Sequence, residues 1–211
     1  MLKTAFRRKP VPYSISELDL GPWPEQAITQ RDFFVLNKPA GLSVHNDSES
    51  LESLLRGHAK GSQKIHFLTR LDRETSGCLL ASFQAHLVAP LQEILASDSS
   101  RKEYRGLVGR TREPLPASTW SWQDSMTDKA EGRTQPLGPI GQRIAAHTQV
   151  ELLRENEWFR ELRFTLRTGR QHQIRKHAAF HKMPLLGDPR YGRPGLNQKV
   201  AELYQFHRMA L

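Results

Sequence analysis

The 211-residue sequence contains a single cysteine, Cys78, and no long run of apolar residues. One cysteine cannot form an internal disulfide or a cysteine-based zinc site, and we expect it to be a small buried hydrophobic residue. The apolar runs are far shorter than the ~20 residues that cross a bilayer, so no membrane segment is predicted. The first ten residues are basic but have no apolar stretch behind them, which predicts that no secretory signal is present. These features favour a reducing, cytoplasmic environment.

Positive charge, by contrast, is abundant. Lys and Arg number 31 against 22 Asp and Glu, which gives a net charge of +9 and a pI near 10.0. The stretch from Arg160 to Arg193 alone holds nine Lys or Arg and two acids, a local charge of +7. This clustering predicts a basic face and a polyanionic partner, because each phosphate that Lys or Arg neutralises releases condensed counterions.

The hydrophobic periodicity predicts an α+β fold. Alternating or short apolar segments indicate strands at 32–37, 78–83, 102–108, 148–153 and 159–167. Residues at helical spacing indicate helices at 50–56, 84–96 and 171–181. Prolines mark an irregular lead-in at 1–30 and a loop region at 111–143. We therefore predict one domain over residues 31–211, with a large mixed, mostly antiparallel sheet flanked by helices and loops.

One polar segment carries a carboxylate between two arginines. Asp72 lies between Arg70 and Arg73, just before the predicted strand at 78–83. If these guanidinium groups are close in space, they lower the pKa of Asp72, and an ionised, positioned carboxylate can act as nucleophile or general base. An ordinary turn with surface ion pairs shows the same pattern, and the segment alone favours that interpretation.

Four more segments, in a fixed order along the chain, change the balance. Together with Asp72 the set is NKPAG (37–41), RLDRETSG (70–77), KEY (102–104), TGRQHQIR (168–175) and GDPRYG (187–192). In this order the segments resemble the motifs of the RluA family of pseudouridine synthases, and the resemblance runs from about Asp32 over most of the chain.

The resemblance implies an enzyme that isomerises uridine in tRNA or rRNA to pseudouridine, with no cofactor and no metal. It implies that Asp72 is the catalytic carboxylate, as nucleophile or as base, and that Arg175 forms an ion pair with it. It further implies that Tyr104 stacks on the uracil and that Arg70 fills the space of the extruded nucleotide. Lys38 is expected either to contact the RNA backbone or to hold its own loop. Further contacts with the RNA backbone are expected from Arg167, Arg170 and Lys176. We expect the domain at 31–211 to be the catalytic domain of a monomer.

The sequence departs from the family pattern in two places. Thr69 stands where many relatives have a histidine before the RLD triplet, which leaves the RNA contact of that histidine without a candidate. The residues before Asp32 are too few for the separate RNA-binding domain that many relatives carry. Target choice would then rest on the catalytic domain, which favours a small stem-loop as substrate.

Three other functions are compatible with parts of the sequence: a metal site, RNA binding without catalysis, and DNA binding. His177 and His181 have the spacing of two metal ligands, with His172 nearby, but Ala178 occupies the position where zinc proteases carry a glutamate. Packing or phosphate contact explains these histidines better. A catalytically silent RNA-binding protein of the same fold would share the charge and the aromatic residues. Asp72 favours the enzyme, because a carboxylate in a polyanion-binding cleft weakens affinity unless it performs chemistry. No helix-turn-helix or zinc-finger signature indicates DNA binding.

Overall fold

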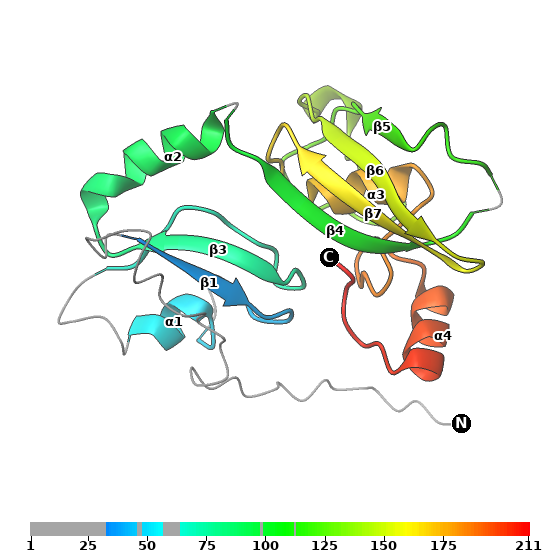
Figure 1. Cartoon of the computed structure of the whole chain (residues 1–211), viewed down its shortest axis with the longest axis horizontal. Coiled ribbons are helices and arrows are strands. Elements are labelled where there is room, and N and C mark those ends of the chain that lie inside the picture. Colours follow the sequence, from blue (N-terminus) through cyan, green and yellow to red (C-terminus); the bar gives the residue numbers. More distant parts are fainter. Residues whose placement is uncertain (1–32, 46–47, 57–63, 98, 112) are drawn as a thin grey trace.

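The computed structural model describes residues 33–45, 48–56, 64–97, 99–111 and 113–211, so the predicted lead-in at 1–30 lies outside the described residues. Strands and helices are distributed along the whole described chain (Figure 1). In chain order they are β1 (Phe34–Lys38), α1 (Leu51–Arg56), β2 (His66–Phe67), β3 (Gly77–Ser82), η2 (Ala85–Leu87), α2 (Val88–Ala96), β4 (Lys102–Gly109), β5 (Thr119–Trp122), η3 (Ile140–Gln142), β6 (Thr148–Glu155), β7 (Phe159–Leu166), α3 (Gln173–Phe180) and α4 (Pro194–Tyr204).

The strands form two sheets, and the prediction of one large sheet is corrected on this point. A three-stranded sheet has the order β1–β3–β2, and a four-stranded sheet has the order β4–β7–β6–β5. Each of the strand pairings within them is antiparallel. Because β3 already pairs on both sides, β4 cannot extend the first sheet through it, and α2 carries the chain across to the second sheet (Figure 1). The predicted α+β class is confirmed.

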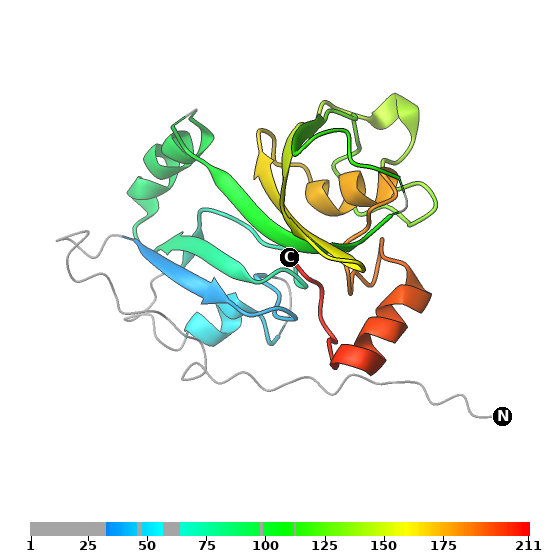
Figure 2. The ribbon, with the colours of Figure 1, turned by 45° about the vertical axis from the view of Figure 1, so that its right-hand side comes forward.

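Each sheet covers its own hydrophobic cluster. In the three-stranded sheet, the buried side chains of β1 and β3 pack against Leu51 and Leu55 of α1. In the four-stranded sheet, one face of the strands packs against Ile174 and Ala178 of α3. The strands curve around this helix (Figure 2). The alternation of buried and half-exposed residues along β7 follows from this one-sided burial.

Four elements and one residue differ from the sequence-based expectation. Strand β5 and the short helix η3 lie within the segment predicted as loop, and the two-residue strand β2 was not predicted. Helix α4 begins with a proline and a glycine, which do not suggest a helix interior. Pro194 is compatible with α4 because it occupies the first turn, where its missing N–H is not needed. Cys78 is exposed, not buried, because it points away from the core face to which Leu79 contributes.

The last residues of the chain connect the two sheets. Leu107 N–H in β4 donates to Ala210 O at 3.1 Å, and Ala210 N–H donates to Leu186 O at 2.9 Å. Ser76 N–H, in the segment that leads into β3, donates to Leu211 O at 3.2 Å. Residues 210 and 211 therefore fix the connection that carries Asp72 relative to the four-stranded sheet. Within the described ranges, none of the helices has the length and apolar character needed to span a bilayer.

Candidate active site

Asp72 and Arg175, which are 103 positions apart in the chain, meet between the two sheets. The guanidinium Nη1 of Arg175, in α3, donates to Oδ2 of Asp72 at 2.9 Å. The side chain of Arg175 is 2% exposed, whereas that of Asp72, in the connection between β2 and β3, is 25% exposed. A buried cation thus holds a carboxylate that remains open to a ligand.

The other edge of the Arg175 guanidinium is held by Asp188. Its Nε and Nη2 donate to the two carboxylate oxygens of Asp188, each at 2.9 Å, in a bidentate pair. Asp188 also accepts the backbone N–H groups of Arg190 at 2.8 Å and Tyr191 at 3.0 Å. Burial alone would raise the pKa of Asp188, but its hydrogen bonds and charge interaction with Arg175 outweigh burial and lower it. The GDPRYG segment therefore fixes the guanidinium in place.

A third carboxylate, Glu74, shares Nη1 of Arg175 with Asp72. Its Oε2 lies 3.2 Å from that nitrogen, and its side chain is 28% exposed. Burial would lower the pKa of Arg175, but Asp188 and Asp72 outweigh this effect and raise it. The guanidinium stays charged, so the Asp72 side chain always faces a cation.

Tyr104 lies on β4 with its side chain on the face that packs against α3, and it contacts the cluster under the four-stranded sheet. Burial and, after it, the negative charge of Asp72 raise the pKa of Tyr104. The phenol is therefore within the field of the Asp72 carboxylate and keeps its proton at neutral pH.

Lys38 is fully buried, which corrects the expectation that it contacts the RNA backbone. Its Nζ donates to the carbonyls of Pro39 at 2.9 Å, Leu42 at 2.8 Å and Arg73 at 3.2 Å. Burial lowers the pKa of Lys38 to about 8, partly offset by the carboxylates of the site. The ammonium group ties the loop after β1 to the segment that carries Asp72, which is the loop-holding alternative.

Lys176 is likewise fully buried, and its predicted phosphate contact is corrected as well. Its Nζ donates to Thr127 O at 2.7 Å from within α3. Arg160 and Arg175 are also buried, at 3% and 2% exposure. The basic stretch 160–193 is therefore not one basic face, because packing turns several of its cations inward.

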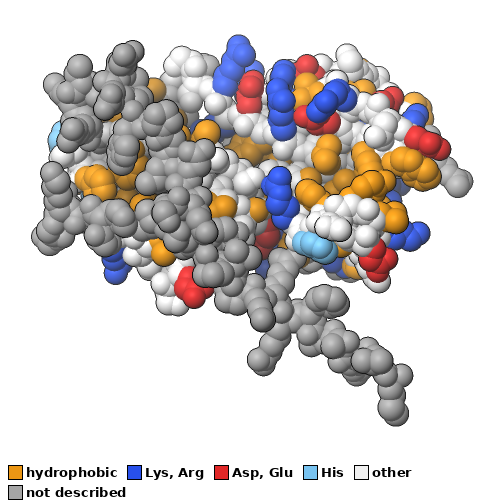
Figure 3. All heavy atoms as spheres, turned by 60° about the horizontal axis from the view of Figure 1, so that its bottom comes forward, with side chains coloured by type: hydrophobic (Ala, Val, Ile, Leu, Met, Phe, Trp, Pro, Cys, Tyr) orange, Lys and Arg blue, Asp and Glu red, His pale blue; other side chains and the backbone are white. Residues whose placement is uncertain are grey.

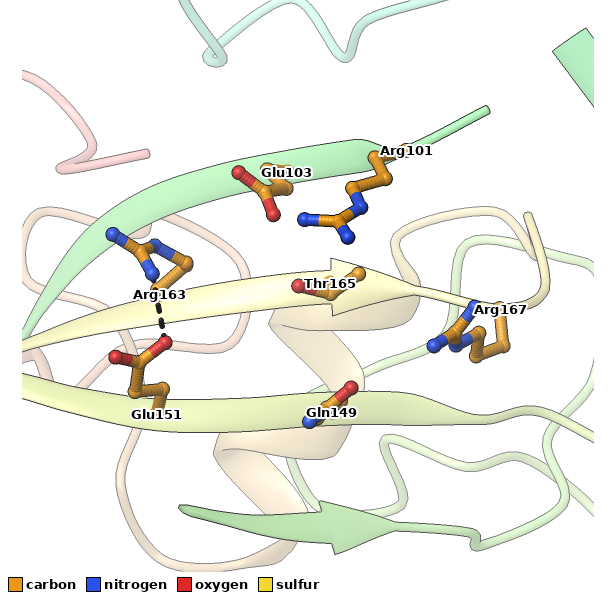
Figure 4. A pocket seen from close by; sticks show the side chains of 7 residues that line it. All are labelled: Arg101, Glu103, Gln149, Glu151, Arg163, Thr165 and Arg167. Carbon is orange, nitrogen blue, oxygen red and sulfur yellow. Dashed lines mark hydrogen bonds and ion pairs between the residues drawn. The ribbon is translucent and has the colours of Figure 1, made fainter. Parts of the chain in front are cut away.

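The three remaining predicted RNA contacts are at least partly exposed, but they occupy different places. Arg70 is exposed and makes no hydrogen bond or ion pair to another described residue. Arg170 precedes α3 and donates from Nε to Ala145 O at 3.1 Å. Arg167 is exposed on the outer face of the four-stranded sheet, with α3 behind the strands (Figure 4). There it lines a polar hollow with Arg101, Glu103, Gln149, Glu151, Arg163 and Thr165. Asp72 does not line this hollow. The candidate active site is therefore the place where Asp72 and Arg175 pair, and not the hollow.

The two histidines considered as metal ligands are engaged in packing and hydrogen bonds. His177 Nδ1 lies 2.9 Å from Thr148 Oγ1, and its Nε2 lies 3.0 Å from Asp124 O. His181 Nε2 lies 2.6 Å from Asp124 Oδ2, and its ring stacks on Trp122 with a centroid distance of 5.0 Å. Both nitrogens of His177 are thus occupied by neighbours within the protein.

Sequence reasoning left three residues of the site without a role: Asp188, Gln173 and His172. The side chain of Gln173 accepts hydrogen bonds from Thr168 Oγ1 at 2.7 Å and Arg170 N–H at 3.0 Å, and donates to His147 O at 3.0 Å and Thr148 Oγ1 at 2.9 Å. It thereby fixes the loop that enters α3. His172 Nε2 lies 3.7 Å from Asp72 Oδ2. All three residues stand in the quoted motifs, but motif spacing does not show which side chains turn toward Asp72.

Comparison with known proteins gives one consistent family. Residues 32–180 match the family model described as RNA pseudouridylate synthase. An uncharacterized RNA pseudouridine synthase homologue of Mycoplasma pneumoniae is 32% identical over 166 residues, 75% of this chain and 52% of that protein. The tRNA pseudouridine synthase C of Vibrio parahaemolyticus is 25% identical over 201 residues, 88% of this chain and 81% of that protein.

A solved structure supports the same fold. Human RNA pseudouridylate synthase domain containing 1 has a TM-score of 0.66 and 20% identity, covering 86% of this chain and 72% of that one. The chain spans about half the length of the first curated relatives that it matches, 52% and 55% for the two mycoplasma proteins.

Proposed function

The chain belongs to the RNA pseudouridylate synthase family, in its RluA branch, and on this premise we propose that it isomerises uridine to pseudouridine in RNA. The C1′–N1 bond breaks, the uracil turns, and a C1′–C5 bond forms. C5 loses a proton and N1 gains one, so the reaction needs neither a redox partner nor a group donor.

The observation that carries the proposal is the 2.9 Å contact between Asp72 Oδ2 and Arg175 Nη1, with Tyr104 near enough for the charge of Asp72 to raise its pKa. We assign Asp72 as the carboxylate that acts at the ribose, as nucleophile or as base. Arg175 pairs with that carboxylate and orients it, since the position of Arg175 is itself fixed by Asp188. When RNA covers the site and excludes water, this ion pair strengthens.

Tyr104, the exposed Arg70 and the partly exposed Arg170 have the chemistry to bind the extruded nucleotide and its backbone. The neutral phenol of Tyr104 offers a face on which uracil stacks and can still rotate. Arg70, exposed two positions before Asp72, is assigned to the space that the extruded nucleotide vacates, because C1′ and the base edges are shielded until the base leaves the stack. Arg170 is assigned to a backbone phosphate. Lys38 positions the Asp72 segment and does not bind RNA.

We propose a stem-loop of tRNA or rRNA as the substrate. Relatives of this chain carry both kinds of name: Ribosomal large subunit pseudouridine synthase D of Vibrio cholerae, 30% identical, and tRNA pseudouridine synthase C of Vibrio parahaemolyticus. The proposal includes a catalytic unit within residues 31–211 that acts as a monomer in the cytoplasm.

Release of tritium from RNA labelled at uracil C5 tests the proposal. The purified chain is mixed with labelled tRNA and rRNA transcripts, and RNA affinity is measured in parallel by filter binding. We expect release by the wild-type chain, and no release by Asp72→Asn with RNA binding retained. RNA binding without release by the wild-type chain would instead indicate a catalytically silent RNA-binding protein. Turnover by Asp72→Asn would refute the role of Asp72.

A further inference from the structure

The surroundings of His172 point to a role for this residue in holding the catalytic carboxylate. We propose that neutral His172, fixed by Tyr191 as the tautomer with its proton on Nε2, is the second donor to Oδ2 of Asp72. Together with Arg175 it orients the free Oδ1 toward the ribose. The inference rests on the proposed function, because it concerns the same carboxylate, and it makes His172 a positioning residue.

The two oxygens of Asp72 have different surroundings. Oδ2 lies 2.9 Å from Arg175 Nη1 and 3.7 Å from His172 Nε2. No described residue donates a hydrogen bond to Oδ1. One donor leaves the carboxylate able to rotate about it, whereas two donors on the same oxygen fix its plane. The 3.7 Å distance is slightly longer than a hydrogen bond, as is common for catalytic contacts that tighten only in the substrate complex.

The hydrogen bonds behind His172 assign its tautomer. Glu131 N–H donates to the hydroxyl oxygen of Tyr191 at 3.1 Å, so the hydroxyl hydrogen of Tyr191 is available for another acceptor. That acceptor is His172 Nδ1, which lies 3.1 Å away. A neutral imidazole that accepts at Nδ1 carries its proton on Nε2, the nitrogen that faces Asp72. The network thus makes His172 a donor toward the carboxylate.

The charge state of His172 agrees with this role. Burial lowers its pKa, Asp72 acts in the opposite direction, and the net result is a lowered pKa. The other charged groups that act on it are Arg175, Arg190 and Glu74. At neutral pH His172 is therefore uncharged, and it orients Asp72 without adding a second cation to the pair with Arg175.

The backbone of His172 shows that its orientation is imposed by the fold. Its φ is 57°, in the left-handed region that non-glycine residues seldom adopt, and the residue immediately precedes the first residue of α3. The adjacent loop is held in this shape by Gln173, which accepts from Arg170 N–H. Such strained residues persist where the surrounding structure determines them, and they cluster at functional sites. Here the strained turn directs the imidazole to Asp72.

Substitutions at position 172 separate positioning from folding. His172→Asn adopts the left-handed backbone readily and keeps a polar group near the Nδ1 position, but its amide is too short to reach Asp72. We expect its single-turnover rate of tritium release to fall by about 10- to 100-fold, the effect of losing a hydrogen bond to a charged group, with RNA affinity unchanged. His172→Gln places an amide donor near the Nε2 position and should recover most of the rate.

The matched control is His86→Gln, the same substitution at an exposed histidine in η2, beyond the end of β3 that is remote from Asp72. Its rate should equal that of the wild-type chain. Melting temperatures are recorded for all variants. If His172→Gln fails to fold, His172→Asn and Tyr191→Phe decide the question, because both must lose rate without losing RNA affinity.

A double-mutant cycle tests the role of Tyr191. Tyr191→Phe removes the hydroxyl that fixes the tautomer, so it should slow tritium release in the wild-type background. Its effect on the rate should be much smaller in the His172→Gln background, because a glutamine amide has no tautomer to fix. The lost contact with Glu131 is common to both backgrounds and cancels in the cycle.

Several results would overturn the inference. The first is a wild-type rate of tritium release in His172→Asn. The second is a slower rate in His172→Asn that is explained by an equal loss of RNA affinity. The third is an equal effect of Tyr191→Phe on the rate in the wild-type and His172→Gln backgrounds. These results leave the proposed function intact, because the wild-type chain would still release tritium. If the wild-type chain releases none from any RNA, the proposed function fails, and the role of His172 fails with it.

Discussion

At the scale of single residues, the buried guanidinium of Arg175 determines how the site is built. Removing a cation from water is costly unless carboxylates pair with it and satisfy its hydrogen bonds. Asp188, with a side chain 1% exposed, meets this need through two hydrogen bonds. Asp72 is therefore not required to be buried as well, and its 25% exposure keeps it accessible to a substrate. One acid stabilises the cation and the other remains available for chemistry.

Asp188→Asn should strongly destabilise the protein. It leaves the buried Arg175 with a neutral partner, and breaking a buried ion pair costs about 3–5 kcal/mol of the free energy of unfolding. Urea denaturation measures the loss. Glu74→Gln is the matched control on the same guanidinium: its carboxylate is 28% exposed, and solvent screening limits the expected loss to about 1 kcal/mol. Equal losses in the two variants would contradict the division of roles between these acids.

Substitutions of Tyr104 should separate the ring from the hydroxyl. Tyr104→Phe retains the stacking surface and should keep much of the rate of tritium release. Tyr104→Ala removes that surface, whose stacking on a base contributes about 1–3 kcal/mol, and should lose rate. Single-turnover assays on the same RNA compare the two variants. If both react at one rate, the stacking role is excluded.

At the scale of elements, α3 is an unusual helix because most of its buried side chains are polar. It spans eight residues, and its buried members include Gln173, Arg175, Lys176 and His177. Each of them finds partners: carboxylates for Arg175, a carbonyl for Lys176, and a hydroxyl and a carbonyl for His177. Polar groups buried in this way fix the position of the helix, because any shift leaves them unpaired. The N-terminal end of α3 is thereby placed at Asp72.

The buried histidine of α3 predicts a pH dependence of stability. Burial lowers the pKa of His177 from 6.5 to about 4. Between these pH values the unfolded chain binds a proton that the folded chain does not, so stability falls as the pH drops from 6.5 towards 4. The loss amounts to about 3 kcal/mol for this shift. Urea denaturation of the wild-type chain and His177→Gln over this pH range measures it, and the difference in stability between the two should change with pH. A constant difference would contradict the prediction.

At the scale of the whole molecule, the site depends on how the two sheets meet. Asp72 belongs to a connection of the three-stranded sheet, whereas Tyr104 and Arg175 belong to the four-stranded sheet and its helix. Hydrogen bonds of the last residues, Ala210 and Leu211, join the two parts. In the space-filling view, Lys and Arg side chains stand among hydrophobic and acidic ones and not as a continuous basic face (Figure 3). Because Lys38 and Lys176 are buried as well, we expect RNA to contact separate arginines.

Salt dependence distinguishes a phosphate contact from general charge. Arg170→Ala should weaken RNA binding and reduce the slope of log affinity against log salt by about 1, the value for one lost phosphate contact. Lys199→Ala, at an exposed position in α4, removes the same charge and serves as the control. Filter binding at several salt concentrations measures both slopes. An unchanged slope for Arg170→Ala would exclude the phosphate contact.

The sequence by itself determined the class of the fold and the family. Periodicity is a local property, so the strands at β1, β3, β4, β6 and β7 and the helices at α1, α2 and α3 were predicted near their observed positions. Strands β2 and β5 and helices η3 and α4 were missed. Elements β2, β5 and η3 are too short to show a period, and α4 begins at Pro194. The order of the motifs indicated the family, because the residue types are specific even where their contacts are unknown.

Only the tertiary structure decided which motif residues meet and which charges are buried. Burial depends on segments distant in the chain: Lys38 lies beneath the backbone of Arg73, and Lys176 lies against Thr127. Both carry the charge expected of an RNA contact, and nothing in their local sequence shows that they are covered. The separation into two sheets, the clamp of Asp188 on Arg175 and the turn of His172 toward Asp72 likewise arise from long-range packing, which residue spacing does not encode.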